Sequence, residues 1–236
     1  MYTIKEEIAN AITHGLGVLL SIPAIVFLVI FAIRYGSPVD VVSFSIFGAS
    51  MLFLYLSSTL LHSIQHQKTK DILEIIDHSA IYVLIAGTYT PLLLGPLKGT
   101  LGYTMLAVVW GLAIGGVVFK IFFVKRFIVV STLVYLVMGW MAIIAIKPLY
   151  TALTGEGFAL LLLGGILYSV GTIFYLWRKI PYHHAIWHTF VLGGSASILR
   201  GKGAVYIING ENQAPIKEAW FFYARSCLFS VRTYAG

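Results

Sequence analysis

The sequence predicts an all-α fold, an integral membrane bundle of seven transmembrane helices with a cytoplasmic N-terminus. Of its 236 residues, 59% are apolar and only 11% are charged, which is less than half the charged fraction of a soluble domain. Division of the chain at every Asp, Glu, Lys and Arg leaves seven charge-free windows, each long enough for a membrane-spanning helix of about 20 residues. The windows cover residues 8–33, 41–67, 78–97, 99–119, 127–146, 157–177 and 180–199.

The first window is predicted to stay in the protein as a helix rather than to be cleaved as a signal peptide. Two acids, Glu6 and Glu7, stand ahead of it, and it is longer than the apolar region of a signal peptide. Pro23 lies inside it, which a transmembrane helix tolerates. The second window ends shortly after His62, and the third helix is expected to open at Asp77.

The later windows carry the ordinary features of membrane helices. Gly111, Gly115 and Gly116 in the fourth window favour close helix packing. Aromatic residues such as Trp140 and Trp177 lie toward the ends of their windows, which is typical of the interfacial belt. These residues therefore indicate packing and membrane anchoring rather than cofactor binding.

The C-terminal part of the chain differs in composition from the rest. Arg200-Gly-Lys202-Gly interrupts the seventh apolar window, which leaves about 16 residues after His184, and the charged fraction about doubles beyond it. We therefore predict a membrane domain over residues 1–199 and an atypical polar tail over residues 200–236. A reading-frame change near residue 196 and a genuine external tail are the two explanations.

The orientation follows from the distribution of basic residues between alternating connections. Eight Lys and Arg residues fall on the N-terminal side and three on the other side, and the positive-inside rule places the richer side in the cytoplasm. The richer side carries Lys5, Lys68, Lys70, Lys120, Lys125, Arg126, Arg178 and Lys179, and the other side carries Arg34, Lys98 and Lys147.

Composition also excludes several classes of protein. Cys227 is the single cysteine, which argues against a disulfide-stapled secreted domain and against zinc held by cysteine clusters. Basic residues occur singly or in pairs between apolar spans, so the net charge of +7 indicates membrane topology and not nucleic-acid binding.

Three groups of polar residues stand out because ionisable side chains at membrane depth need partners. Ser58 and His62 end the second helix, Asp77 opens the third, and His184 and His188 lie at the start of the seventh. With the N-terminus inside, all three groups lie at the same depth on the cytoplasmic side.

The histidine spacing indicates a metal site. His184 and His188 are four residues apart, so both rings project from one helix face, and His62 supplies a third imidazole. Three neutral imidazoles hold zinc with one coordination position open, as in catalytic sites. Asp77 would balance the charge and accept a proton from water, and Ser58 would share the pocket.

Plainer interpretations remain for each histidine. An HxxxH pair on an apolar helix is often two hydrogen-bonded interior side chains. His66 is expected to be solvated, and His78 and His183 are expected to point away from the site. For His14, which stands with Glu7, Asn10 and Thr13, we favour a polar cluster in the helix cap region.

These residues together resemble the hemolysin III branch of the progestin and adipoQ receptor (PAQR) family, which is related to the alkaline ceramidases. The resemblance covers about residues 1–196. It implies a seven-helix bundle with zinc bound by His62, His184 and His188 and a site lined by Asp77 and Ser58. It also implies hydrolysis of lipid amides in relatives, whereas the bacterial members are named for haemolysis. The motifs are Glu7-Ile-Ala-Asn10 with Thr13-His14, the SxxxH of Ser58 and His62, Asp77, and the HxxxH of His184 and His188.

The leading functional hypothesis is a zinc-dependent, ceramidase-like hydrolase of a membrane lipid amide or ester in the plasma membrane. Asp77 would act as the base, Ser58 would donate to the developing oxyanion, and the apolar bundle would admit an acyl chain. The alternatives are a pore-forming cytolysin and a ligand-sensing receptor that uses zinc for structure.

Overall fold

The computed structural model describes residues 2–153 and 155–208, with side chains as far as Gly201, and all regular secondary structure in these ranges is helical. The predicted all-α bundle is therefore confirmed. The elements are α1 (Ile4–Tyr35), α2 (Pro38–Ser63), α3 (Gln67–Leu94), α4 (Thr100–Phe123), α5 (Ile128–Trp140), the 3-10 helix η1 (Met141–Ala145), α6 (Ile146–Ala152), α7 (Gly155–Leu176) and α8 (His183–Ile208).

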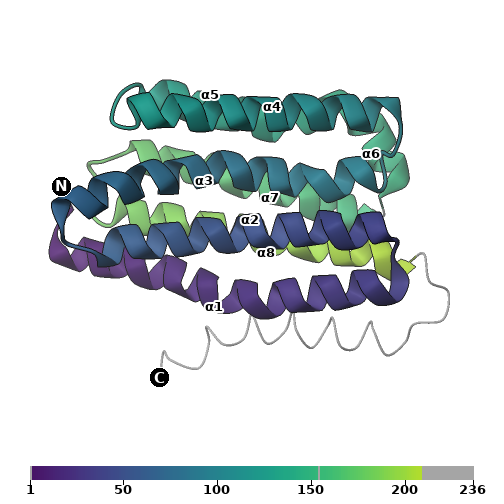
Figure 1. Cartoon of the computed structure of the whole chain (residues 1–236), viewed down its shortest axis with the longest axis horizontal. Helices are drawn as coiled ribbons and strands as arrows, with labels where there is room; N and C mark the ends of the chain where they lie inside the picture. Colours follow the sequence, from purple (N-terminus) through teal and green to yellow (C-terminus); the bar gives the residue numbers. More distant parts are fainter. Residues whose placement is uncertain (1, 154, 209–236) are drawn as a thin grey trace.

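The long helices lie side by side along one axis and are joined by short connections (Figure 1). Helices α1 to α4, the combined segment α5–η1–α6, and α7 are each long and apolar enough to cross a membrane. Helix α8, with 26 residues, meets the same length requirement. In sequence order each of α1 to α4 packs against the next, and α8 closes the bundle by packing against both α7 and α1.

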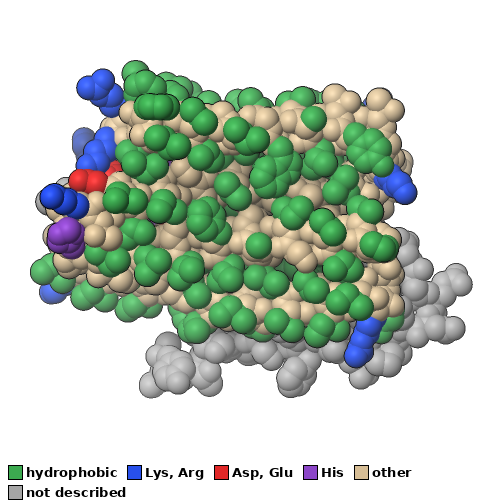
Figure 2. All heavy atoms as spheres, in the orientation of Figure 1, with side chains coloured by type: hydrophobic (Ala, Val, Ile, Leu, Met, Phe, Trp, Pro, Cys, Tyr) green, Lys and Arg blue, Asp and Glu red, His purple; other side chains and the backbone are tan. Residues whose placement is uncertain are grey.

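The outer surface suits a lipid environment. Figure 2 shows apolar side chains along the length of the helices on one face, whereas charged side chains gather at the two ends. Helix α1, for example, exposes Ile12, Leu19 and Ile33 by more than half of their surface. Such a large exposed apolar surface is unfavourable in water and is expected in a bilayer.

Capping explains where the first two helices begin. Thr3 and Glu6 form a reciprocal capping box on α1, and Ser37 and Asp40 form another on α2. Each box satisfies backbone N–H groups that have no partner within the helix. As a result, α1 begins four residues before its charge-free window, and its acids belong to the helix.

Three positions differ from the sequence-based expectations. Helix α3 begins at Gln67, so Asp77 lies almost three turns inside the helix instead of opening it. Helix α8 continues through Arg200 to Ile208, so the Gly-rich stretch does not end it. Lys120 is a fully buried residue of α4 and not part of a connection. Charged residues do not stop a helix, because the backbone hydrogen bonds form regardless of side-chain polarity. Residues 209–236 of the predicted tail lie outside the described part of the chain.

The span α5–η1–α6 contains a break between its first two parts. At this break the Tyr89 hydroxyl of α3 donates to the carbonyl of Gly139 (2.6 Å) and accepts from the N–H of Ala142 (2.8 Å). Backbone groups released from a helix at membrane depth must be satisfied within the protein. The Tyr89 hydroxyl of α3 therefore supplies hydrogen bonds that the interrupted helix does not make itself.

Close packing of α2 against α3 depends on a glycine. A Cβ atom at Gly87 would lie 2.2 Å from Ser50 Oγ, closer than such atoms approach, whereas a Cβ at Gly111 would meet open space. Small residues at such positions allow two helix backbones to approach. Only the first of these glycines is therefore needed for helix contact within the described chain.

Candidate metal centre

Three histidines from two helices converge in the interior of the bundle. His62 comes from the last turn of α2, and His184 and His188 lie one turn apart on α8. One potential ligand atom of each lies within 4.8 Å of the others, and all three side chains are buried. The structure thus brings the three predicted residues together, in a group that could hold a metal ion.

The orientation of His62 is fixed by a carboxylate of α1. Its Nδ1–H donates to Glu7 Oε2 at 2.6 Å, and the other carboxylate oxygen of Glu7 pairs with Lys70. His62 Nε2 is buried and has no hydrogen-bond partner in the described structure. A histidine that donates through one ring nitrogen to a carboxylate and leaves the other free is the usual arrangement of a metal ligand.

His188 is oriented in the same way by the next turns of α1. Its Nδ1 lies 3.2 Å from the carbonyl oxygen of Asn10 and 3.0 Å from Thr13 Oγ1. A carbonyl only accepts, so Nδ1 carries the hydrogen and Nε2 carries the lone pair. Two of the three imidazoles therefore keep an Nε2 lone pair that is available to a metal ion.

Asp77 and Ser58 line the same cavity as His184 and His188. The Asp77 side chain is buried, and its Oδ2 lies 3.9 Å from His78 Nδ1. The buried Ser58 hydroxyl has no hydrogen-bond partner in the described structure. Asp77 does not belong to the close group of three ligand atoms. The two residues thus lie beside the histidines in the positions of neighbours and not of direct ligands.

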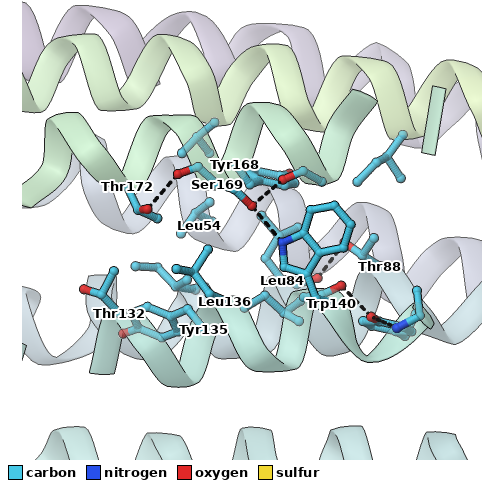
Figure 3. Close-up of a pocket in the computed structure, with 18 of the residues that line it drawn as sticks. Leu54, Leu84, Thr88, Thr132, Tyr135, Leu136, Trp140, Tyr168, Ser169 and Thr172 are labelled. Carbon is cyan, nitrogen blue, oxygen red and sulfur yellow. Dashed lines mark hydrogen bonds between the residues drawn. The ribbon is translucent and has the colours of Figure 1, made fainter. Parts of the chain in front are cut away.

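The cavity extends from the histidines deep into the bundle. Its wall includes both His184 and Ile198 of α8, positions about 21 Å apart along a helix. Figure 3 shows its middle part, where side chains of α5 and α7 point toward one another. There the indole N–H of Trp140 donates to Ser169 Oγ at 2.9 Å and bridges these two helices. Apart from such hydroxyl groups, the far part of the wall is made mainly of Leu, Ile and Phe side chains.

Of the other histidines, one is exposed and two form hydrogen bonds within the protein. His66 is exposed, and the ring nitrogens of His78 bond the carbonyl of Glu74 and the hydroxyl of Tyr175. His183 Nδ1 lies 3.1 Å from the carbonyl of Phe174. Neither His78 nor His183 belongs to the group of three histidines, but His78 lines the cavity beside Asp77 and does not point away from it as expected.

The expectation for His14 was wrong. Thr3 is the cap residue of α1, and His14 lies about three turns deeper, buried, with its ring stacked on His188 at a centroid distance of 3.5 Å. Neither ring nitrogen of His14 has a hydrogen-bond partner in the described structure. Its seven-residue spacing from Glu7 was the available signal, because that spacing places both side chains on one helix face.

The end of the cluster nearest the N-terminus is covered by Tyr2. Its ring lies 5.2 Å from His184, 5.6 Å from His183 and 6.1 Å from His62, measured between centroids. Burial raises the pKa of the Tyr2 phenol to about 12, so the ring stays neutral at physiological pH. Sequence reasoning missed this residue, because nothing in its local pattern indicates contact with α8.

Comparison with known proteins finds relatives over most of the chain. A family model described as haemolysin-III related matches residues 2–199. The chain is 80% identical over 198 residues to a hemolysin-3 homolog of Bacillus subtilis, covering 84% of this chain and 93% of that protein. It is 65% identical over 193 residues to hemolysin-3 of Bacillus cereus, covering 82% and 88%. Human monocyte to macrophage differentiation factor is 28% identical over 204 residues, covering 82% of each chain. With a family model over most of its length and these identities, the chain belongs to the haemolysin-III related family of multi-pass membrane proteins.

Proposed function

We propose that the protein is a zinc-dependent hydrolase of a membrane lipid amide or ester, acting in the plasma membrane with its N-terminus in the cytoplasm. One observation carries the proposal: two members of a buried group of three histidines, His184 and His188, line a long, mainly apolar cavity. A metal-ligating set next to space for an acyl chain is what hydrolysis of a lipid requires.

Zinc fits these residues better than a hard cation does. The group offers three imidazole nitrogens, whereas magnesium and calcium prefer oxygen ligands. The unpartnered Nε2 of buried His62 also supports a ligand role, since an unsatisfied buried polar atom is costly. When bound, zinc would supply Lewis acidity, which polarises a carbonyl group and makes water a stronger acid.

Two side chains would carry out the proton transfer and stabilise the developing charge. Asp77 accepts a proton from water as the water oxygen bonds to the carbonyl carbon, and the Ser58 hydroxyl donates to the carbonyl oxygen as negative charge develops there. Cleavage of the carbon–nitrogen or carbon–oxygen bond then releases a fatty acid, and Asp77 passes the proton to the departing amine or alcohol. The acyl chain lies along the cavity, about 21 Å of which α8 alone lines between His184 and Ile198.

Metal content and hydrolysis of the purified protein test the proposal together. We expect about one zinc per chain and release of fatty acid from ceramide-like or phospholipid substrates. His188→Ala should lose zinc, and Asp77→Asn should keep zinc while turnover falls by about 10²-fold to 10⁴-fold, the usual effect of losing a general base. His66→Ala is the matched control, because this histidine is exposed and away from the cluster.

The Bacillus cereus relative is named hemolysin-3, so lysis of cells through a pore is the alternative to be tested. The hydrolase proposal fails if Asp77→Asn protein, at equal membrane abundance, lyses erythrocytes as well as the parent and neither releases fatty acid. Lysis through a pore does not require a general base. Joint loss of lysis and hydrolysis would instead make lysis a consequence of lipid cleavage.

A further inference from the structure

The Tyr2 ring packs against the histidine cluster from just ahead of α1. It contacts His184 and His62 and also His183, the first residue of α8. Tyr2 lies outside α1, two residues ahead of Ile4. A side chain ahead of the first turn can swing away without breaking hydrogen bonds within the helix, because those bonds begin after it.

A hydrogen bond links the start of α1 to the connection between α7 and α8. The backbone N–H of Tyr182 donates to Glu6 Oε1 at 3.3 Å, and Glu6 also caps α1 through Thr3. Tyr182 has a left-handed backbone (φ 57°), which turns the chain into α8 just before the histidines. The N-terminal segment that carries Tyr2 is therefore tied to the connection that leads into α8.

The opposite approach to the cluster is unsuitable for a hydrated cation. From the far end an ion would have to pass the Leu, Ile and Phe side chains of the cavity wall. Removing a divalent ion from water into such surroundings is very costly. The side covered by Tyr2 is polar, with Glu6 and Lys70 nearby on α1 and α3.

We propose that Tyr2 is the gate through which the metal ion enters and leaves the histidine cluster, so that its ring controls the rate of metal exchange and not the affinity. This inference rests on the metal site of the proposed function. Tyr2 contributes no ligand atom to the group, so its removal speeds entry and departure by similar factors and leaves their ratio almost unchanged.

Chelator kinetics on the zinc-loaded protein in detergent measure this directly. Tyr2→Ala should release zinc on the order of 10-fold faster, about the effect of losing three weak ring contacts. Uptake by the metal-free protein should accelerate similarly, with the dissociation constant within about threefold of the parent. Tyr2→Phe keeps the ring and should behave like the parent, and Tyr103→Ala, half exposed at the other end, is the control. Unchanged release, or faster release with unchanged uptake, overturns the gate.

Histidine modification by diethyl pyrocarbonate tests the gate without any metal. In the metal-free protein, Tyr2→Ala should make His184 react several-fold faster, whereas exposed His66 reacts equally in both proteins and serves as the internal reference. Equal protection of His184 with and without the Tyr2 ring refutes the gate. A parent protein that binds no zinc refutes the proposed function. In that case the modification rates still test separately whether the Tyr2 ring controls access to His184.

Discussion

Glu7 should set the zinc affinity of the cluster without touching the ion. Its carboxylate is 6% exposed and accepts the Nδ1–H of His62 at 2.6 Å while it also pairs with Lys70. A hydrogen bond to a charged partner stabilises by about 1.5 to 3 kcal/mol, against about 0.5 to 1.5 kcal/mol for a neutral one. Glu7→Gln keeps a neutral acceptor and loses the charge, so the expected cost is about 1 to 1.5 kcal/mol, or roughly 10-fold in the zinc dissociation constant. Glu7→Ala removes the acceptor as well and should approach the 100-fold upper end for losing a residue that orients a ligand, a range of about 10-fold to 100-fold.

Equilibrium competition against a fluorescent zinc chelator measures both Glu7 variants in detergent, with circular dichroism to check helicity. Glu156→Gln is the matched control, because its exposed carboxylate pairs with Arg200 at the opposite end of the bundle. The reasoning would be refuted by dissociation constants within twofold of the parent for both Glu7 variants at unchanged helicity. In that case His62 would be oriented by its packing and not by the carboxylate.

Three further expectations concern the site, the packing and the orientation. Ser58→Ala should lower hydrolysis by about 10²-fold to 10³-fold with zinc content unchanged, as for loss of an oxyanion donor; equal turnover would remove Ser58 from the mechanism. Gly87→Ala should destabilise the protein by about 1 to 3 kcal/mol in thermal unfolding, because its Cβ has no space, whereas Gly111→Ala should be neutral; equal melting of the two variants would contradict the close helix contact. A topology reporter inserted near Lys125 should report the cytoplasm and one near Pro96 the exterior, and the reverse pattern would place the histidines at the outer leaflet.

The fold and the grouping of the three histidines could be predicted from the sequence because the membrane imposes simple rules. Charge-free length marks the spans, and alternation of the connections brings the end of α2 and the start of α8 to one side. His62, His184 and His188 then had to lie at similar depth, and the structure brings them together. Helix ends could not be found in this way, since charged first turns such as that of α3 remain helical, and this error placed Asp77 at a helix start.

The contacts that surround the three histidines could not be predicted. Glu7, Asn10 and Thr13 of α1 hold His62 and His188 through contacts more than 50 residues apart in the sequence. A single sequence contains no information on the rotation of α1 against α2 and α8, which decides whether these side chains face the site or a helix cap. The inward rotation of α1 also explains why His14 stacks on His188.

The phenol of Tyr89 has a consequence for exchanging parts between relatives. The change from α-helix to 3-10 helix after Trp140 occurs where this side chain of α3 engages Gly139 and Ala142, and no proline stands at that point. The break therefore depends on residues of both α3 and the segment α5–η1. Consider a chimera in which residues 128–152 come from another member of the family. This segment should keep the break only if residue 89 of the recipient protein carries a hydroxyl group. In a recipient without that hydroxyl, the same segment should straighten or the chimera should lose stability.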